Sequence, residues 1–239
     1  MASLMKYGLL AATLIAISAT FGCGGSSNGG GSFGSANIRV LVLNPTAGNV
    51  SVSVDGRMVN SNLAYLGDTG YVPIKAGGGQ LTIVTPNPTA VAGVDTVVNL
   101  AADSHTTFLL DGWAHFEQSS FMLTDDNTPA PNSAAKLRIL NASLGSIKDF
   151  YLLPAGSMPG GTPLASGMAF NNATNYQVLA PGSYEVFATL VFTPTQIFFD
   201  SGPITLAAGQ NRTLVLLSNC QPNVCSMDNM ISITLADLN

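Results

Sequence analysis

The sequence predicts an all-β protein built from two tandem antiparallel β-sandwich domains. Charged residues make up 9% of the 239-residue chain, against about 25% in average globular domains, so turns and uncharged polar side chains must supply much of the surface. The 25 glycines and 13 prolines suit short strands joined by turns better than helices. Val50, Val52 and Val54 alternate with Ser51 and Ser53, the period of two that buries one face of a strand. A strand–turn–strand pattern also occurs twice, roughly one hundred residues apart, a spacing that suits tandem domains.

The repeated pattern is clearest at 175–190, where runs of β-branched and aromatic residues flank Pro181 and Gly182. Proline presets one turn dihedral and glycine accepts a positive one, so the segment predicts a strand, a tight turn and a second strand. The earlier version runs from 71–77 through two further glycines into 80–85. Three other pairs of segments match between the halves: 38–44 with 137–141, 68–71 with 173–176, and 100–110 with 206–216.

The N-terminal segment has the layout of an export signal. Lys6 precedes an apolar run at 7–17, and small residues follow up to Gly22 and Cys23. The apolar run is shorter than the ~20 residues that a membrane-spanning helix needs. We therefore expect residues 1–22 to be a cleaved signal peptide.

The end of this segment, Thr-Phe-Gly-Cys at 20–23, resembles the bacterial lipoprotein signal, in which the cysteine is diacylated and becomes the first mature residue. Cys23 is therefore the expected lipidation site. Gly24, in place of aspartate after the cysteine, resembles Gram-negative sorting to the outer membrane. The alternative is ordinary secretion, with Cys23 lost within the signal.

Residues 23–36 form a tether rich in glycine and serine, which would span about 20 Å as a flexible coil. Of the three cysteines, lipidation of Cys23 leaves Cys220 and Cys225 as an even pair. Export favours oxidation, so we expect a disulfide that stiffens the hairpin between Leu217 and Ile231. A redox pair and a metal pair are the weaker alternatives.

After the tether we expect a first sandwich at 37–124, a linker at 125–135 and a second sandwich at 136–239. About seven short strands per copy suggest an immunoglobulin-like architecture, although the immunoglobulin cysteines and core tryptophan are absent. The expected strands of the first copy are 38–43, 50–54, 70–74, 81–85, 96–100, 106–110 and 121–124. Those of the second copy are 137–141, 150–153, 175–179, 184–190, 197–206, 212–217 and 230–235.

Several of these stretches carry a family resemblance. Residues 39–44 followed by 52–56, and again 138–142, resemble the opening of the bacterial domain-of-unknown-function family 4397. The segments 176–184 and 206–209 are similar to its "Pro-Ala-Gly-x-Tyr" and "Leu-x-Ala-Gly" signatures. The resemblance covers nearly the whole mature chain, twice over. It implies exported, often lipid-anchored β-sandwich domains and brings no established activity or catalytic residue.

The sequence offers little for catalysis or metal binding. Nucleophilic hydrolysis needs a base beside a nucleophile, and the only two histidines are His105 and His115. His105 falls at the start of an expected strand, and its counterpart in the second copy is Asn211. The oxygen-rich segment 125–127 lacks the spacing of a calcium loop and is interpreted as the start of a solvated linker. We expect no catalytic residue, no metal site and no cofactor.

The one functional hint is an expected loop at 111–118, which contains Trp113, His115 and Phe116. Aromatic side chains at a loop tip can stack on a sugar or dock a partner, or they can fold back as a lid over the core. The second copy places its cysteine loop at the same point.

The sequence thus predicts an exported, lipid-anchored, non-catalytic binding or envelope-structural protein. Its expected partners are the membrane, through the anchor, and envelope proteins or glycans. A net charge of −5 and the lack of a basic cluster argue against nucleic acid. The first alternative is a carbohydrate-binding or adhesive module that uses the loop aromatics. The second is an extracellular hydrolase that depends on His105 or His115.

Overall fold

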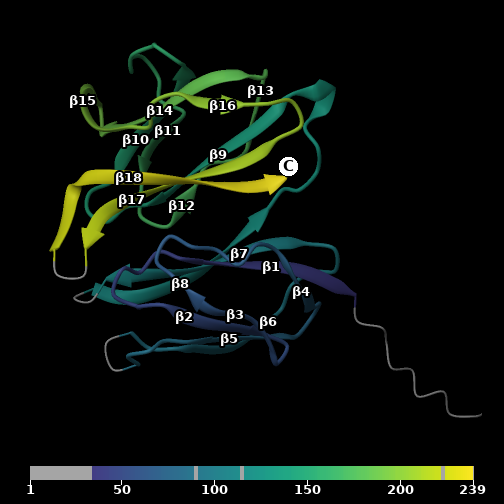
Figure 1. Cartoon of the computed structure of the whole chain (residues 1–239). Coiled ribbons are helices and arrows are strands. Elements are labelled where there is room, and N and C mark those ends of the chain that lie inside the picture. The colour runs from purple at the N-terminus through teal and green to yellow at the C-terminus, as the bar shows by residue number, and fades with distance from the viewer. Residues whose placement is uncertain (1–33, 89–90, 114–115, 222–223, 239) are drawn as a thin grey trace, which may run out of the picture. The chain divides into compact units, whose positions relative to one another are not determined.

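A computed structural model describes residues 34–88, 91–113, 116–221 and 224–238, all of which belong to one compact unit (Figure 1). The all-β prediction is confirmed, since strands dominate the described residues and the helical content is one short turn, η1 (Pro131–Ser133). The strands of the first half are β1 (Ser35–Val42), β2 (Val50–Val54), β3 (Arg57–Leu63), β4 (Val72–Lys75), β5 (Gly79–Val84), β6 (Val94–Val98), β7 (His105–Trp113) and β8 (Phe116–Asp125). Those of the second half are β9 (Ala135–Ala142), β10 (Lys148–Pro154), β11 (Ala165–Met168), β12 (Asn172–Ala173), β13 (Gln177–Leu179), β14 (Gly182–Leu190), β15 (Thr193–Asp200), β16 (Ile204–Leu206), β17 (Asn211–Gln221) and β18 (Val224–Leu238).

The strands form four sheets, two from each half of the unit (Figure 1). Sheet A has the order β4-β1-β7-β8, and sheet B has the order β3-β2-β5-β6. Sheet C has the order β12-β9-β17-β18, with β13 also on β9, and sheet D has the order β11-β10-β14-β15, with β16 also on β14. Most pairs are antiparallel, but β1 lies parallel to β7 and β9 lies parallel to β17.

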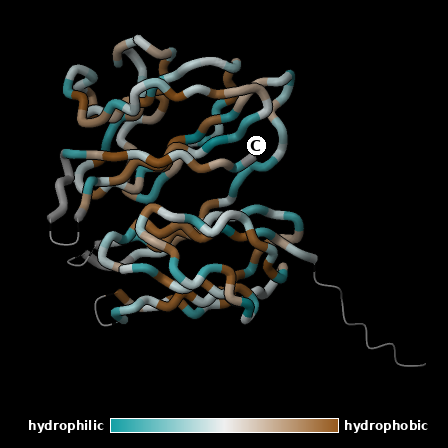
Figure 2. The backbone as a smooth tube through the Cα atoms, in the orientation of Figure 1, coloured by the Kyte–Doolittle hydropathy of each residue, from teal (hydrophilic) through white to brown (hydrophobic). Residues whose placement is uncertain are grey.

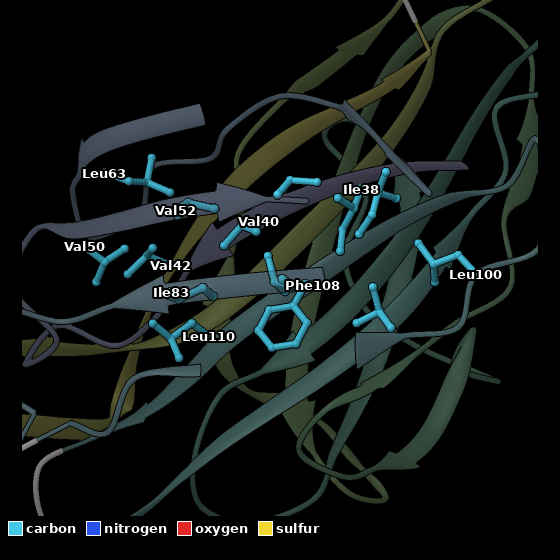
Figure 3. Packing of buried hydrophobic residues seen from close by; sticks show 14 of the residues in the cluster. Ile38, Val40, Val42, Val50, Val52, Leu63, Ile83, Leu100, Phe108 and Leu110 are labelled. Atoms are coloured by element: carbon cyan, nitrogen blue, oxygen red, sulfur yellow. The ribbon is translucent and has the colours of Figure 1, made fainter. Parts of the chain in front are cut away.

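Each half encloses its own core between its two sheets. In the first half, Ile38, Val40 and Val42 of β1 point toward Val52 and Ile83 of sheet B (Figure 3). The expected alternation in β2 places its three valines inside. Figure 2, in which the backbone is coloured by residue hydropathy, shows apolar and polar residues alternating along many strands. The second core lies likewise between sheets C and D, and it contains Leu137, Ile139, Phe150, Val186 and Leu214 among others.

A third apolar cluster lies on the other face of sheets A and C. Leu41 and Leu109 come from sheet A, and Leu140 and Val215 come from sheet C. Both faces of β1 and β9 are therefore buried, which explains why these strands are almost continuously apolar rather than alternating. The same burial applies to the centre of β7 and β17.

The Pro181–Gly182 turn joins strands of different sheets. It leads from β13, which pairs with β9 in sheet C, into β14, which pairs with β10 in sheet D. The corresponding turn of the first half does the same between β4 and β5. At that turn Gly79 packs so closely that a Cβ would lie 2.2 Å from Cγ1 of Ile74.

The structure corrects several strand boundaries. The strands β3, β11 and β12 were not expected, because their sequences are polar and they lie at sheet edges. The single strand expected at 197–206 is two strands, β15 and β16. They are separated by a turn in which Gly202 has a φ of 62° and donates its N–H to Oδ1 of Asp200 at 2.8 Å.

Candidate functional site

The register of sheet A defines two opposite ends of the unit. At one end, which we call the entry end, β1 starts at Ser35, and Asn37 pairs with His105, which pairs with Asp125. At the other end, which we call the tip end, β7 turns into β8. Figure 1 shows the start of β1 and the end of β7 at opposite sides.

The aromatic segment at the tip end is a tight hairpin rather than the expected loop. β7 continues to Trp113, β8 begins at Phe116, and these two residues pair across the ladder. A register shift between Asp111 and Trp113 makes a bulge, with a φ of 121° at Gly112. His115 and the side chains of 113–118 lie outside the described part of the structure.

The cysteines belong to the equivalent hairpin of the second half. Cys220 and Cys225 are direct partners in the β17–β18 ladder, so they do not lie in a loop as expected. Leu217 pairs with Ile231 farther along the same ladder. Cys220 is buried, and the side chain of Cys225 lies outside the described part of the structure.

Both hairpins lie at the tip end, because residues at their bases share one small cavity. The cavity has a volume of about 10 Å³, and Leu43 and Asp111 line it from the first half while Ala142, Leu217 and Cys220 line it from the second. Asp111 is buried, its Oδ1 accepts a hydrogen bond from Gly112 N at 2.6 Å, and its Oδ2 has no partner among the described residues. Burial raises the pKa of Asp111 to about 7, although the Gly112 hydrogen bond acts in the opposite direction.

A second aromatic residue at the tip end was missed by the sequence reasoning. Phe192, in the turn between β14 and β15, is 87% exposed and has a φ of 60°. Bulky residues rarely adopt this conformation. The buried carboxylate of Asp149 holds the turn, since Oδ2 accepts from Phe192 N at 2.9 Å while Oδ1 accepts from Ser166 and Gly167. No local pattern in the sequence marks Phe192, because the strained φ and the exposure depend on the folded turn.

His105 has no arrangement typical of a catalytic base among the described residues. Its Nε2 lies 3.2 Å from Nδ2 of Asn37, and its ring meets the ring of Tyr71 edge-on at 5.0 Å. The neighbouring Ser104 donates its hydroxyl to Ala101 O at 2.7 Å rather than to the histidine. A cleft of about 300 Å³ runs along 103–105 and 124–128 beside it.

The entry end holds a buried charge cluster that the sequence reasoning did not find. Arg39 of β1 extends from the face of sheet A opposite the first core, and its Nη2 lies 2.7 Å from Oδ1 of Asp237 in β18. Its Nη1 donates to Ala236 O at 2.9 Å, and its Nη2 donates to Thr107 Oγ1 at 2.7 Å. The guanidinium stacks over the ring of Tyr71, 4.6 Å from the ring centroid.

The second half repeats this arrangement in the opposite direction. Arg138 of β9 pairs with Oδ1 of Asp125 in β8 and donates to Thr124 O at 2.7 Å and Thr213 Oγ1 at 2.7 Å. Its guanidinium lies 4.6 Å from the centroid of the Tyr176 ring. Asp125 is buried, so the interpretation of this residue as part of a solvated linker is wrong.

The two tyrosines complete the cluster as hydrogen-bond donors. Tyr71 donates to Oδ2 of Asp125 at 2.7 Å, and Tyr176 donates to Oδ2 of Asp237 at 2.8 Å. Burial and the adjacent carboxylates raise the pKa of both tyrosines well above the usual range. Both hydroxyls therefore keep their protons, and the two tyrosines add no charge to the cluster of two arginines and two aspartates.

The described residues lack two further features. No group of three or more histidine, cysteine, aspartate or glutamate side chains lies close enough to hold a metal ion. No helix among those residues is both long and apolar enough to span a bilayer. Cys23 lies outside the described residues.

A comparison of the chain with curated proteins finds no match. Residues 36–148, from β1 to the first residue of β10, match the family described as Domain of unknown function (DUF4397). This match supports the family to which the sequence motifs pointed.

Proposed function

We propose that this chain is an exported, lipid-anchored, non-catalytic binding or envelope-structural protein, and that its contact surface is the tip end. Cys23 would carry the lipid and 23–36 would be the tether. The observation that carries the proposal is the position of the hairpins. The chain enters the unit at Ser35 at one end of sheet A, whereas the Trp113 hairpin lies at the other end.

The strained turn at Phe192 supports this choice of surface. An exposed aromatic side chain on a left-handed backbone lowers stability without burying apolar area, which is the pattern expected of a residue that contacts a partner. Ile147 lies next to Lys148, which pairs with Leu190 just before this turn, and it is 49% exposed. The tip end therefore presents apolar side chains with no described lysine or arginine exposed beside them.

The test is recovery of envelope components with tip-end variants. The anchored protein is purified from native membranes with Phe192→Ala, with Trp113→Ala, and with Met58→Ala as the matched control. Met58 is an exposed apolar side chain on β3, near the entry-end side of sheet B. We expect the two tip-end variants to lose a stoichiometric partner that the control keeps. Equal recovery by all three proteins would contradict the choice of surface.

Anchoring has its own test. The mature N-terminus should carry a diacylglyceryl group on Cys23, and Cys23→Ser should release the protein from the membrane fraction. An unmodified N-terminus downstream of Cys23 would instead identify ordinary secretion. Location in the outer membrane follows from the same experiment when the inner and outer membranes are separated before analysis.

A carbohydrate-binding or adhesive module is the second candidate, and the exposed ring of Phe192 favours it. Aromatic faces stack on sugar rings, and the chain has one tryptophan, so the fluorescence of Trp113 reports directly on the tip end. Quenching by one member of a glycan panel, lost in Phe192→Ala and kept in Met58→Ala, would favour this candidate. No response across the panel, together with a recovered protein partner, would favour the scaffold.

We also propose that the described unit consists of two copies of one immunoglobulin-like sandwich. The equal strand orders of sheets A and C, and of sheets B and D, support this proposal. The direct pairing of Cys220 with Cys225 in the ladder supports a disulfide across the second hairpin. A mass lower by two hydrogens in the non-reduced protein would establish the bond.

A further inference from the structure

The contacts between sheets A and C follow a two-fold pattern. Arg39 reaches from the first half to Asp237 in the second, and Arg138 reaches from the second half to Asp125 in the first. Each arginine also donates to a backbone carbonyl next to the aspartate that it reaches, Ala236 O for Arg39 and Thr124 O for Arg138. The threonine and tyrosine that hold each arginine come from its own half.

The backbone supports the same equivalence at atomic detail. Val40 N and Ile139 N each donate a hydrogen bond to the hydroxyl oxygen of an equivalent threonine, Thr69 and Thr174, both at 3.0 Å. The non-glycine residues Leu66 and Asn171, each three positions before its threonine, have φ values of 64° and 59°. Apolar positions between the sheets also correspond: Leu41 with Leu140, Leu109 with Val215, and Leu123 with Leu235.

An interface of this kind is isologous in character, because each side supplies the same groups that it receives. The first half carries one arginine, one aspartate and an apolar patch, and it is complementary to a surface with the same contents. We infer that the junction surface of each half is self-complementary, so that its natural partner is any second copy of the same sandwich, including another copy of the same half. This goes beyond the proposed function, and it does not depend on the tip-end ligand.

One position breaks the equivalence and explains why the two halves of one chain pair with each other. Asp111 and Leu217 occupy equivalent places in β7 and β17 and line the same cavity from opposite sides. In a pair of first halves, two copies of Asp111 would face each other without a described cation to compensate them. Like charges in a buried interface oppose association, whereas Asp111 opposite Leu217 meets no second charge.

The test uses the full chain with one protease site inserted after Asn132. Pro131, Asn132 and Ser133 are exposed, and both Asn132 and Ser133 adopt positive φ, so this turn suits an insertion. The cut protein is unfolded, refolded and weighed by native mass spectrometry, which separates pairs of unlike halves from pairs of like halves by mass. We expect unlike pairs to dominate, and first–first and second–second pairs to form as distinct species.

The variant Asp111→Leu tests whether this carboxylate opposes the pairing of two first halves. It should raise the share of first–first pairs by roughly tenfold or more, because each such pair loses two buried carboxylates. Asp95→Leu is the matched control, since Asp95 is exposed on β6 of sheet B, away from the junction. This control should leave the share of first–first pairs unchanged.

A second format avoids refolding. The cut protein is mixed with excess cut protein labelled with heavy isotopes, and it is held under native conditions while halves exchange. Recovery of unlike pairs alone in both formats, with and without Asp111→Leu, would overturn the inference. Recovery of unpaired halves alone would overturn it as well.

Discussion

Asp111 and Asp125 are buried carboxylates in neighbouring strands of one sheet, but their surroundings differ. Asp125 receives Arg138, Thr107 and Tyr71. Asp111 receives only the N–H of Gly112, and its second oxygen is unpaired among the described residues. A buried charge is tolerated when a cation and hydrogen bonds compensate it. Ionised Asp125 is therefore compensated and stabilises the fold, whereas ionised Asp111 destabilises it.

Stability should consequently fall as pH rises from the unfolded-state pKa of Asp111 to its folded-state pKa. Its folded-state pKa of about 7 lies above the usual value of 3.8, so the folded protein keeps a proton that the unfolded chain has released. The free energy of unfolding declines from about pH 4 to about pH 7 and is level above that, by roughly 2–3 kcal/mol between pH 5 and pH 8. Denaturant titrations at both pH values measure the difference.

The variant Asp111→Asn should remove this pH dependence, since it cannot ionise. Asp103→Asn provides the control, because Asp103 is exposed and also lies in the first half. A wild-type protein that is equally stable at pH 5 and pH 8 would refute the assignment. So would a variant at Asp111 that keeps the full dependence.

The sequence predicted few of these residue roles. His105 at the start of a strand, and Asn211 at the start of its counterpart, were expected and are confirmed. Asp125 was misread because its neighbours are polar and resemble a linker, and only the folded chain brings Arg138 to it. An arginine in the middle of an apolar strand, as at 39 and 138, is a local signal that could have been used.

At the scale of elements, alternation and β-branched runs were reliable. β2 was predicted to the residue, and most other strands were located within a few residues of their ends. The edge strand β3 has neither signal, because few of its side chains are buried. Register and sheet membership could not be read from the sequence, since both depend on partners far away along the chain.

The close turn between β4 and β5 allows a direct test of one glycine. Gly79→Ala would place a methyl group 2.2 Å from Cγ1 of Ile74, which is itself fully buried. We expect a loss of about 2–4 kcal/mol in the free energy of unfolding. Gly160→Ala is the control, with no atom within 4 Å of the added carbon, and should change stability by less than about 1 kcal/mol. Comparable values for the two variants would argue against tight packing at this turn.

The β14–β15 turn should become more stable when its aromatic residue is replaced. Asparagine tolerates a φ near 60°, so Phe192→Asn relieves strain while it sacrifices little buried area. We expect a gain of about 1 kcal/mol, measured as a higher denaturation midpoint at an unchanged slope. A loss of stability would show that the ring packs against the fold, and it would remove the support that Phe192 gives to a tip-end contact surface.

At the scale of the whole molecule, the sequence repeats predicted two similar halves but not a third buried cluster between sheets. Residues of the third cluster alternate with those of the first two cores along the same strands, as Leu41 does with Val40 and Val42. From sequence alone, a strand that is apolar on both faces could equally lie in the central sheet of one large domain. The partner of the second face therefore had to come from the structure.

The equivalence of the two arginines predicts equal costs for their removal. Arg39→Met leaves Asp237 without its cation, and Arg138→Met removes the nearer cation of Asp125, which keeps Arg39 at 3.7 Å. Removal of one partner from a buried ion pair costs about 3–5 kcal/mol, so both variants should lose that much and agree within about 1 kcal/mol. Arg57→Met, at an exposed position of β3, should cost less than about 0.5 kcal/mol.

Salt provides an independent check on these ion pairs. Buried pairs are screened far less than exposed ones, so the loss caused by Arg39→Met should be nearly the same in dilute buffer and at high ionic strength. If one arginine variant is as stable as Arg57→Met while the other is not, the two sides of the junction are energetically different. The two sides of the junction would then match in their contacts but contribute different free energies. In that case the half whose arginine can be removed without loss of stability should not form pairs with its own copy.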